Sequence, residues 1–375
     1  MKRGIMALED NEETSTPEEQ ARVDAELATN VAENGAEAEG ITNDADRIAE
    51  AQSIGEAVDT MTDTTEAAVE SGEGLSEETA QTVEAAMEHF RTRLGYSKKV
   101  VPSLEGFKDK TTRLEQSKLA LENLKALQAG LDKNLSIAQE GFFARVKNAF
   151  ERWSTSDYEI LKKIEAFKSA AAGEEKEIDD PAWGRVFANS GKTELTASDI
   201  ATLLNHMLTQ RKKAIPHIRK FNDLLRKAKN ELDKSMFIAK DESVAEIDRI
   251  GEDFAGLKEE FQKDFQTSSK ADNVKVKTAN QSDIKKIADL VSKMVNDHEW
   301  NTTITNFVEN AQEADFVNFK NGNTRLIRVV AADLRAYRRV IDDSARTIYS
   351  GISDISSATN KAYYGAYKYL QASIK

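Results

Sequence analysis

Apolar side chains recur every three or four residues through most of this chain, as they do along the buried face of an α-helix. Only four prolines and 18 glycines interrupt the 375 residues, whereas the many turns of an all-β chain need both residue types in number. We therefore predict an all-α fold, an elongated multi-helix bundle. The most regular stretch lies between Asp241 and Gln266 and carries Ile247, Ile250, Phe254, Leu257, Phe261 and Phe265 on one face.

The same spacing predicts the other helices. Pro216 is expected to kink or break the helix in which it lies, because proline lacks the backbone N–H that a helix needs. A long C-terminal helix over 324–373 would measure about 70 Å at 1.5 Å per residue. The polar segment 267–282, between the helices expected at 241–266 and 283–295, contains a short alternating run from Val274 to Val276. Further helices are expected at 76–94, 111–139, 141–153, 158–172, 196–236, 283–295 and 303–319.

Charge and aromatic residues are distributed unevenly along the chain. Residues 1–88 hold 24 acidic and 4 basic residues and not one Phe, Trp or Tyr. The net charge is −16 over residues 1–140 and +3 over residues 141–375. Near the start, a marginal helix is expected from Pro17 to Gly35, where glycine would end it. We expect this front segment to build no core and to be detachable; a disordered acidic tail kept for solubility is the alternative.

This asymmetry predicts three regions. The first is an acidic leader with few aromatics, residues 1–75, expected to be partly disordered. The second, residues 76–140, is expected to form a helical hairpin that completes a propeptide-like region. The third, residues 141–375, is expected to be a helical mature domain. A hinge is expected near 173–192, where a charged connector contains Pro181.

The residue inventory excludes several kinds of chemistry. Cysteine is absent, which excludes disulfides, zinc ribbons, iron–sulfur clusters and thiol nucleophiles. None of the four histidines has a Glu three residues before it or a second His four residues away, as bundle metal sites require. Ser190 to Thr193 resembles the end of a phosphate-binding loop, but the upstream glycine spacing is wrong. We therefore predict a non-enzyme without catalytic, cofactor or metal residues. A Ser-His-Asp triad assembles in space, so the sequence leaves that arrangement open.

Two rows of basic residues are candidates for contact with phosphate, which attracts cations irrespective of base sequence. Residues 211–229 hold eight basic residues and one acidic residue. A solvated face, or salt bridges to neighbouring acidic helices, is the alternative. The candidate nucleic-acid-binding residues are Lys212, Arg219, Lys220, Arg226 and Lys227 in the first row and Arg328, Arg335, Arg339 and Arg346 in the second.

Several short motifs in the first 155 residues carry a family resemblance: Met6 to Glu9, His89 to Gly95, Pro102 to Phe107, Thr112-Arg113 and Ala120 to Lys125. Over about residues 1–155 the chain resembles internal head proteins of large tailed (jumbo) bacteriophages. The resemblance implies a virion structural protein in the capsid interior, present in the host cytoplasm during assembly and in some members delivered with the DNA. It also implies three partners: the prohead protease, other capsid and core proteins, and packaged DNA bound without sequence preference.

The resemblance further implies cleavage after a Glu that follows a small residue by two positions. Ala138, Gln139 and Glu140, followed by Gly141, match this pattern and coincide with the switch in net charge. We take them as the candidate cleavage site. An uncut Glu140 within a helix is the alternative. The pattern also occurs at Ala7 to Glu9, Ser71 to Glu73, Ser103 to Glu105 and Ala120 to Glu122.

Two other classes of function stay open at this point. A cytoplasmic helical adaptor or coiled-coil scaffold would use the face from Ile247 to Phe265 to bind a partner. A helical nuclease or nucleotide enzyme would need a clustered carboxylate or phosphate site. No apolar run approaches the roughly 20 residues that cross a bilayer, so no transmembrane segment is expected. The sequence does not determine an oligomeric state.

Overall fold

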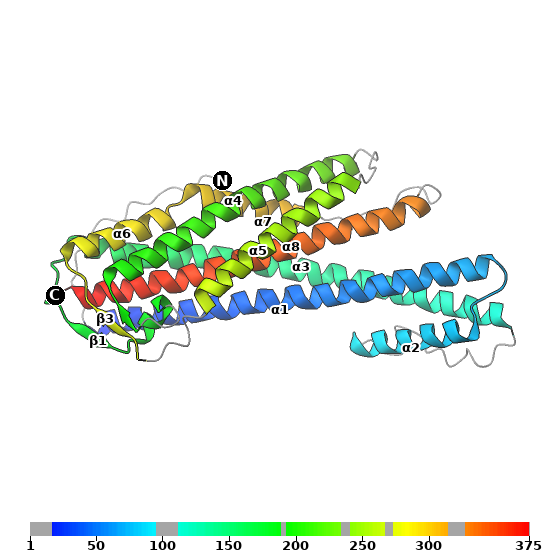
Figure 1. Ribbon diagram of the computed structural model, residues 1–375, viewed down its shortest axis with the longest axis horizontal. Helices are drawn as coiled ribbons and strands as arrows, with labels where there is room; N and C mark the ends of the chain where they lie inside the picture. The colour runs from blue at the N-terminus through cyan, green and yellow to red at the C-terminus, as the bar shows by residue number, and fades with distance from the viewer. Residues whose placement is uncertain are drawn as a thin grey trace.

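The computed structural model describes residues 17–94, 112–188, 193–233, 241–266, 273–313 and 327–374. Long helices lying side by side form an elongated bundle, which confirms the predicted all-α class and the long C-terminal helix (Figure 1). The elements are α1 (Pro17–Glu70), α2 (Glu77–Arg93), α3 (Arg113–Phe167), β1 (Glu177–Asp179), η2 (Ala182–Phe187), β2 (Glu194–Leu195), α4 (Ala197–Asp233), α5 (Asp241–Gln266), β3 (Lys275–Lys277), α6 (Gln281–Val295), α7 (His298–Glu313) and α8 (Ile327–Ser373).

A small sheet lies at one end of the bundle, in segments that the sequence led us to expect as connectors. Its strand order is β1-β3-β2. Strand β1 runs antiparallel to β3, with Glu177 opposite Lys277, and β2 runs parallel to it, with Glu194 opposite Lys275. The alternation at Val274 to Val276 was the one local signal of this sheet. Strands of two or three residues are too short for periodicity to reveal them.

Helix α8 is the central element, because it contacts α1, α3, α4, α5 and α6. From Ile341 onward it is buried on nearly every side. Small residues let its neighbours approach closely. At Gly351, for example, a Cβ atom would lie 2.5 Å from the ring of Phe254 on α5. A helix buried all round is the expected centre of a bundle.

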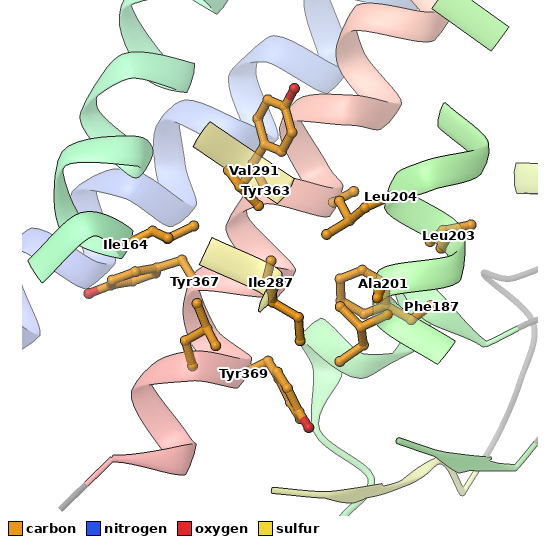
Figure 2. Close-up of a cluster of buried hydrophobic side chains, with 14 of the residues drawn as sticks. Ile164, Phe187, Ala201, Leu203, Leu204, Ile287, Val291, Tyr363, Tyr367 and Tyr369 are labelled. Carbon is orange, nitrogen blue, oxygen red and sulfur yellow. The ribbon is translucent and has the colours of Figure 1, made fainter. Parts of the chain in front are cut away.

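Two apolar cores flank α8 along the bundle. The first core lies at the middle of the bundle and contains Trp153, Ile250, Phe254, Phe307 and Tyr349. The other lies toward the C-terminal end, where aromatic side chains of α8 meet η2, α4 and α6 (Figure 2). The second core contains Phe187, Leu204, Ile287, Val291, Tyr363, Tyr367 and Tyr369.

A third core makes a separate arm, which we define as residues 51–94 and 112–135. It projects beyond the rest of the bundle, with α2 folded back along α1 and α3 (Figure 1). Leu124 and Val58 are fully buried in it. The N-terminus of α2 is capped by Ser76, whose side chain accepts a hydrogen bond from the Thr79 N–H. The core residues are Ile54, Val58, Leu75, Ala80, Val83, Met87, Ala120, Leu124, Leu127 and Leu131.

The front of the chain departs from the sequence-based expectation. Helix α1 runs through Gly35 without ending, and its apolar side chains are buried, so the prediction that this segment builds no core is wrong for residues 17–75. The stripe is too thin to form a core alone but joins cores supplied by other helices. Residues 1–16 lie outside the described residues. The buried side chains include Leu27, Val31, Ile41, Ile48, Ile54 and Val58.

Helix α3 is also longer than expected. The segments predicted as separate helices at 111–139 and 141–153 are one helix, which continues to Phe167. The predicted boundary at 140 therefore falls inside a helix. Pro216 likewise lies within α4 without ending it. Aromatic side chains of this helix are packed in the core, with Phe142 and Trp153 both 2% exposed.

Candidate processing site and charged interfaces

The candidate cleavage site lies in the middle of α3. Ala138, Glu140 and Gly141 are exposed, whereas Gln139 is buried. The next residue, Phe142, is anchored in the central core. Because the bond after Glu140 belongs to a continuous helix, a protease that reads extended chain needs this turn to open before it can cut.

Gly141 makes that opening easier. A glycine inside a helix costs about 1 kcal/mol relative to alanine. A Cβ atom at Gly141 would meet no other atom within 4 Å, so close packing does not require the glycine. Its effect is therefore to weaken α3 locally at the bond in question.

The first basic row lies on α4, which packs against α5 and α7. Arg219 pairs with Glu299 of α7 at 2.9 Å and also donates a hydrogen bond to the Thr303 hydroxyl. Lys220 pairs with Glu246 of α5 at 2.9 Å. The charges of Arg219 and Lys220 are thus partly neutralised within the molecule. This agrees with the alternative that the basic row forms salt bridges to neighbouring helices.

The rest of this row is more open. The Arg226 guanidinium lies 3.9 Å from the Asp223 carboxylate, and both side chains are about two-thirds exposed. Lys212 is exposed. The side chain of Lys227 lies outside the described residues. Arg226 is therefore more exposed to an approaching phosphate chain than Arg219 and Lys220 are.

In the second row, the side chains of Arg328, Arg335 and Arg339 lie outside the part of the chain that the structure describes. Arg346 is only 6% exposed and forms an ion pair with Asp343 one helical turn earlier. It faces the interior of the bundle, not solvent. In the described structure, Arg346 is therefore not available to a ligand outside the bundle.

The structure also shows a charged interface between α1 and α3 that the sequence analysis missed. Glu37 contacts both Arg145 and Arg152 at 3.4 Å, and Asp44 pairs with Arg145. The acidic residues are seven apart and so are the basic ones, which places each pair on one helical face. That matched spacing was a usable signal, but nothing in the sequence identified the two helices as neighbours.

Helix α1 has a second polar attachment, to the end of α8. The Asp24 carboxylate accepts hydrogen bonds from Lys368 at 2.8 Å, from Gln371 at 3.0 Å and from the Tyr367 hydroxyl. Burial tends to raise the pKa of Asp24, but the hydrogen bonds outweigh it and the net shift is downward. The carboxylate is therefore held in its charged form.

A buried polar network joins α3, α4 and α8. Arg211 is 2% exposed, donates a hydrogen bond to the Met294 carbonyl at 3.0 Å and lies 5.1 Å from the centre of the Trp300 ring. Asp157 accepts a 2.8 Å hydrogen bond from Asn360. Burial raises the pKa of Asp157 to about 6, against the opposing effects of the Arg211 charge and of that hydrogen bond.

The described part of the chain contains neither a cluster of metal-ligating side chains nor a membrane-spanning helix. Within those residues no three His, Asp or Glu side chains gather as a metal site would require. None of the helices there is both long and apolar enough to span a membrane. Residues 190–192 of the loop-like Ser-Gly-Lys-Thr motif lie outside the described residues. The face from Ile247 to Phe261, which an adaptor would offer to a partner, is buried against this chain's own core.

Comparison with known proteins identifies the family. The sequence model of phiKZ-like phage internal head proteins matches residues 33–375. The motifs that carry the resemblance lie within the first 155 residues. The family match extends far beyond them and includes all of α3 and α8. No curated protein matched, and neither did any solved structure. Since the match covers most of the sequence, the chain belongs to the phiKZ-like phage internal head proteins.

Proposed function

We propose that this protein is packaged in the capsid together with the DNA and is matured by a cut after Glu140. The observation that carries the proposal is the family match over residues 33–375, because an internal head protein resides in the capsid interior. Other capsid proteins are then its neighbours, and its role is structural. We further propose two specific partners, the prohead protease and the packaged DNA.

Three independent features support the cut at Glu140. The local sequence fits the expected pattern, and the net charge changes sign there, from −16 before the bond to +3 after it. The site also joins the arm to the remainder of α3, and Glu140 and Gly141 are exposed. The helix must open for cleavage, and Gly141 lowers the free energy of that opening.

Intact-mass analysis of the protein from purified particles tests this proposal. We expect a polypeptide that begins at Gly141. Glu140→Gln should leave this bond uncut, whereas Glu122→Gln, a matched change in another copy of the pattern on α3, should not affect the new terminus. A full-length chain in mature particles would contradict processing at this site.

Contact with DNA is proposed for the basic row on α4. Substituting Arg219, Lys220, Arg226 and Lys227 by Gln should weaken binding and reduce its dependence on salt concentration, because fewer counterions are released. Glu246→Gln together with Glu299→Gln is the matched control, since it removes the carboxylates that pair with Lys220 and Arg219 and should strengthen binding. Equal affinity in all three proteins would exclude this row as the contact surface.

Delivery into the host with the DNA is the last part of the proposal. It rests on the family assignment, and the absence of a membrane-spanning helix from the described residues is compatible with it. Mass spectrometry of infected cells in which new protein synthesis is blocked should detect peptides from 141–375. Their retention in emptied particles would contradict delivery.

A further inference from the structure

We infer that the described residues of 141–374 form a docking groove for an acidic amphipathic helix, and that the fragment 1–140 stays bound in this groove through residues 17–50 of α1 once the chain is cut. The inference rests on the proposed function only for the position of the cut. It changes the expected product of processing from a lone C-terminal domain to a complex of two pieces.

The apolar part of the groove lies between α3 and α8, both of which contact α1. Ile41 is fully buried and Ile48 is 3% exposed, in the core that also contains Phe142, Val146 and Trp153 of α3. Nearer its start, α1 adds Leu27 and Val31 to the core at the C-terminal end of α8. The front half of α1 therefore contributes side chains to both large cores of the bundle.

The polar part of the groove presents cations at matched positions. Arg145 and Arg152 meet Glu37, and Lys368 meets Asp24. Glu37, Asp24 and Lys368 are only about one-fifth exposed, so solvent screens these pairs less than it screens ordinary surface pairs. The groove thus fits a helix with acidic side chains beside an apolar stripe.

A buried hydrogen bond also fixes how that helix is aligned along the groove. Asn34 of α1, which is 5% exposed, donates a hydrogen bond to the Asn360 side chain of α8 at 3.2 Å. Asp44 pairs with Arg145 and Glu37 with Arg152, so α1 runs antiparallel to α3. Thr42 likewise meets Ser350 while Asn34 meets Asn360, so α1 runs antiparallel to α8 as well. A shift of α1 by one turn would break the hydrogen bond between Asn34 and Asn360 and leave the buried Asn34 amide without its partner on α8.

All of these partners follow residue 140 in the chain. A cut after Glu140 therefore breaks one peptide bond and removes none of the contacts that residues 17–50 make with the groove. The fragment 1–140 also keeps the arm, whose core is formed entirely by residues 54–131. Both pieces consequently retain their buried surfaces after the cut.

The test uses the full chain with a recognition sequence for a site-specific protease inserted between Glu140 and Gly141. The folded protein is cut and then analysed by size-exclusion chromatography at low and high salt. We expect fragments 1–140 and 141–375 to elute together at both. Separate elution of the cut wild-type fragments at low salt would overturn the inference.

A matched pair of variants distinguishes docking at this groove from nonspecific association. Asp24→Lys with Glu37→Lys and Asp44→Lys reverses the charges that face the groove and should weaken retention about tenfold or more. Glu26→Lys with Glu39→Lys and Asp46→Lys makes the same change in net charge at exposed positions of α1 and should have little effect. Equal release by both triple variants would contradict docking.

Two further readouts keep the outcomes separate. Circular dichroism before the cut shows whether each variant folds, and only folded variants are compared. Mixing cut protein with an isotope-labelled cut copy reports on exchange; fast exchange of fragment 1–140 at low salt would contradict stable docking. If mass analysis of particles finds no cut at Glu140 while the engineered fragments stay together, the proposed processing fails and the docking groove stands.

Discussion

Asn34 and Asn360 are 326 positions apart in the chain, and their side-chain amides form a hydrogen bond inside the bundle. Asn360 is fully buried and also donates to the Ser156 hydroxyl at 3.0 Å and to Asp157. One side chain on α8 thus connects α1 with α3. Such a network is stabilising only when all of its members are paired.

Replacing Asn360 by alanine should lower the free energy of unfolding by about 2–4 kcal/mol, because three polar partners inside the bundle lose a hydrogen bond. Asn34→Ala removes only the link to α1 and should cost about 1–2 kcal/mol. Urea denaturation of the two variants and of the double variant measures both effects and their coupling. Equal losses in the two single variants would contradict the central position of Asn360.

The raised pKa of Asp157 predicts a specific dependence on pH. Between about pH 4 and pH 6 the folded chain holds a proton on Asp157 that the unfolded chain has released. Lowering the pH from 7 to 5 should therefore stabilise the fold by about 1 kcal/mol through this group, and the gain is lost as the pH rises through 6. Asp157→Asn should abolish this contribution. Urea denaturation of the wild type and of Asp157→Asn at pH 7 and pH 5 measures this contribution. If the free energy of unfolding changes by the same amount between the two pH values in both proteins, the assignment to Asp157 is contradicted.

Gly351 and Gly256 make a matched pair of glycines, one on α8 and one on α5. Gly351→Ala should destabilise the protein by about 1–3 kcal/mol, because the new methyl group would lie 2.5 Å from the buried Phe254 ring. Gly256→Ala places its methyl group where no atom lies within 4 Å and should stabilise by about 0.5–1 kcal/mol. Thermal denaturation compares them, and the same sign of shift for both would be inconsistent with the packing.

The separate core of the arm predicts that it can unfold ahead of the rest. Leu124 is fully buried there, so Leu124→Ala should cost the arm about 2–4 kcal/mol. All three tryptophans lie at 153 and beyond, outside the arm. Circular dichroism should therefore show an earlier partial transition while tryptophan fluorescence keeps the wild-type midpoint. A shift of both signals together would show that the arm and the remaining helices unfold as one unit.

The helices could largely be predicted from the sequence, because burying one face of a helix requires apolar residues at three- and four-residue spacing. Helix α5 has the predicted bounds, Asp241–Gln266. The absence of cysteine and the acidic character of the front segment are likewise properties of the sequence alone. The motifs of the first 155 residues were sufficient to indicate the family, which the match over residues 33–375 confirmed.

What required the tertiary structure was the assignment of partners. The apolar stripe of α1 is too thin to predict burial, and it becomes core only because α3 and α8 supply the opposing surface. Nothing in the sequence distinguishes the partners of Arg219 from those of Arg145. In the structure Arg219 pairs with Glu299, whereas Arg145 pairs with Glu37 and Asp44. The physical reason is that periodicity reports how one helix is used, whereas ion pairs and shared cores depend on which helices lie side by side.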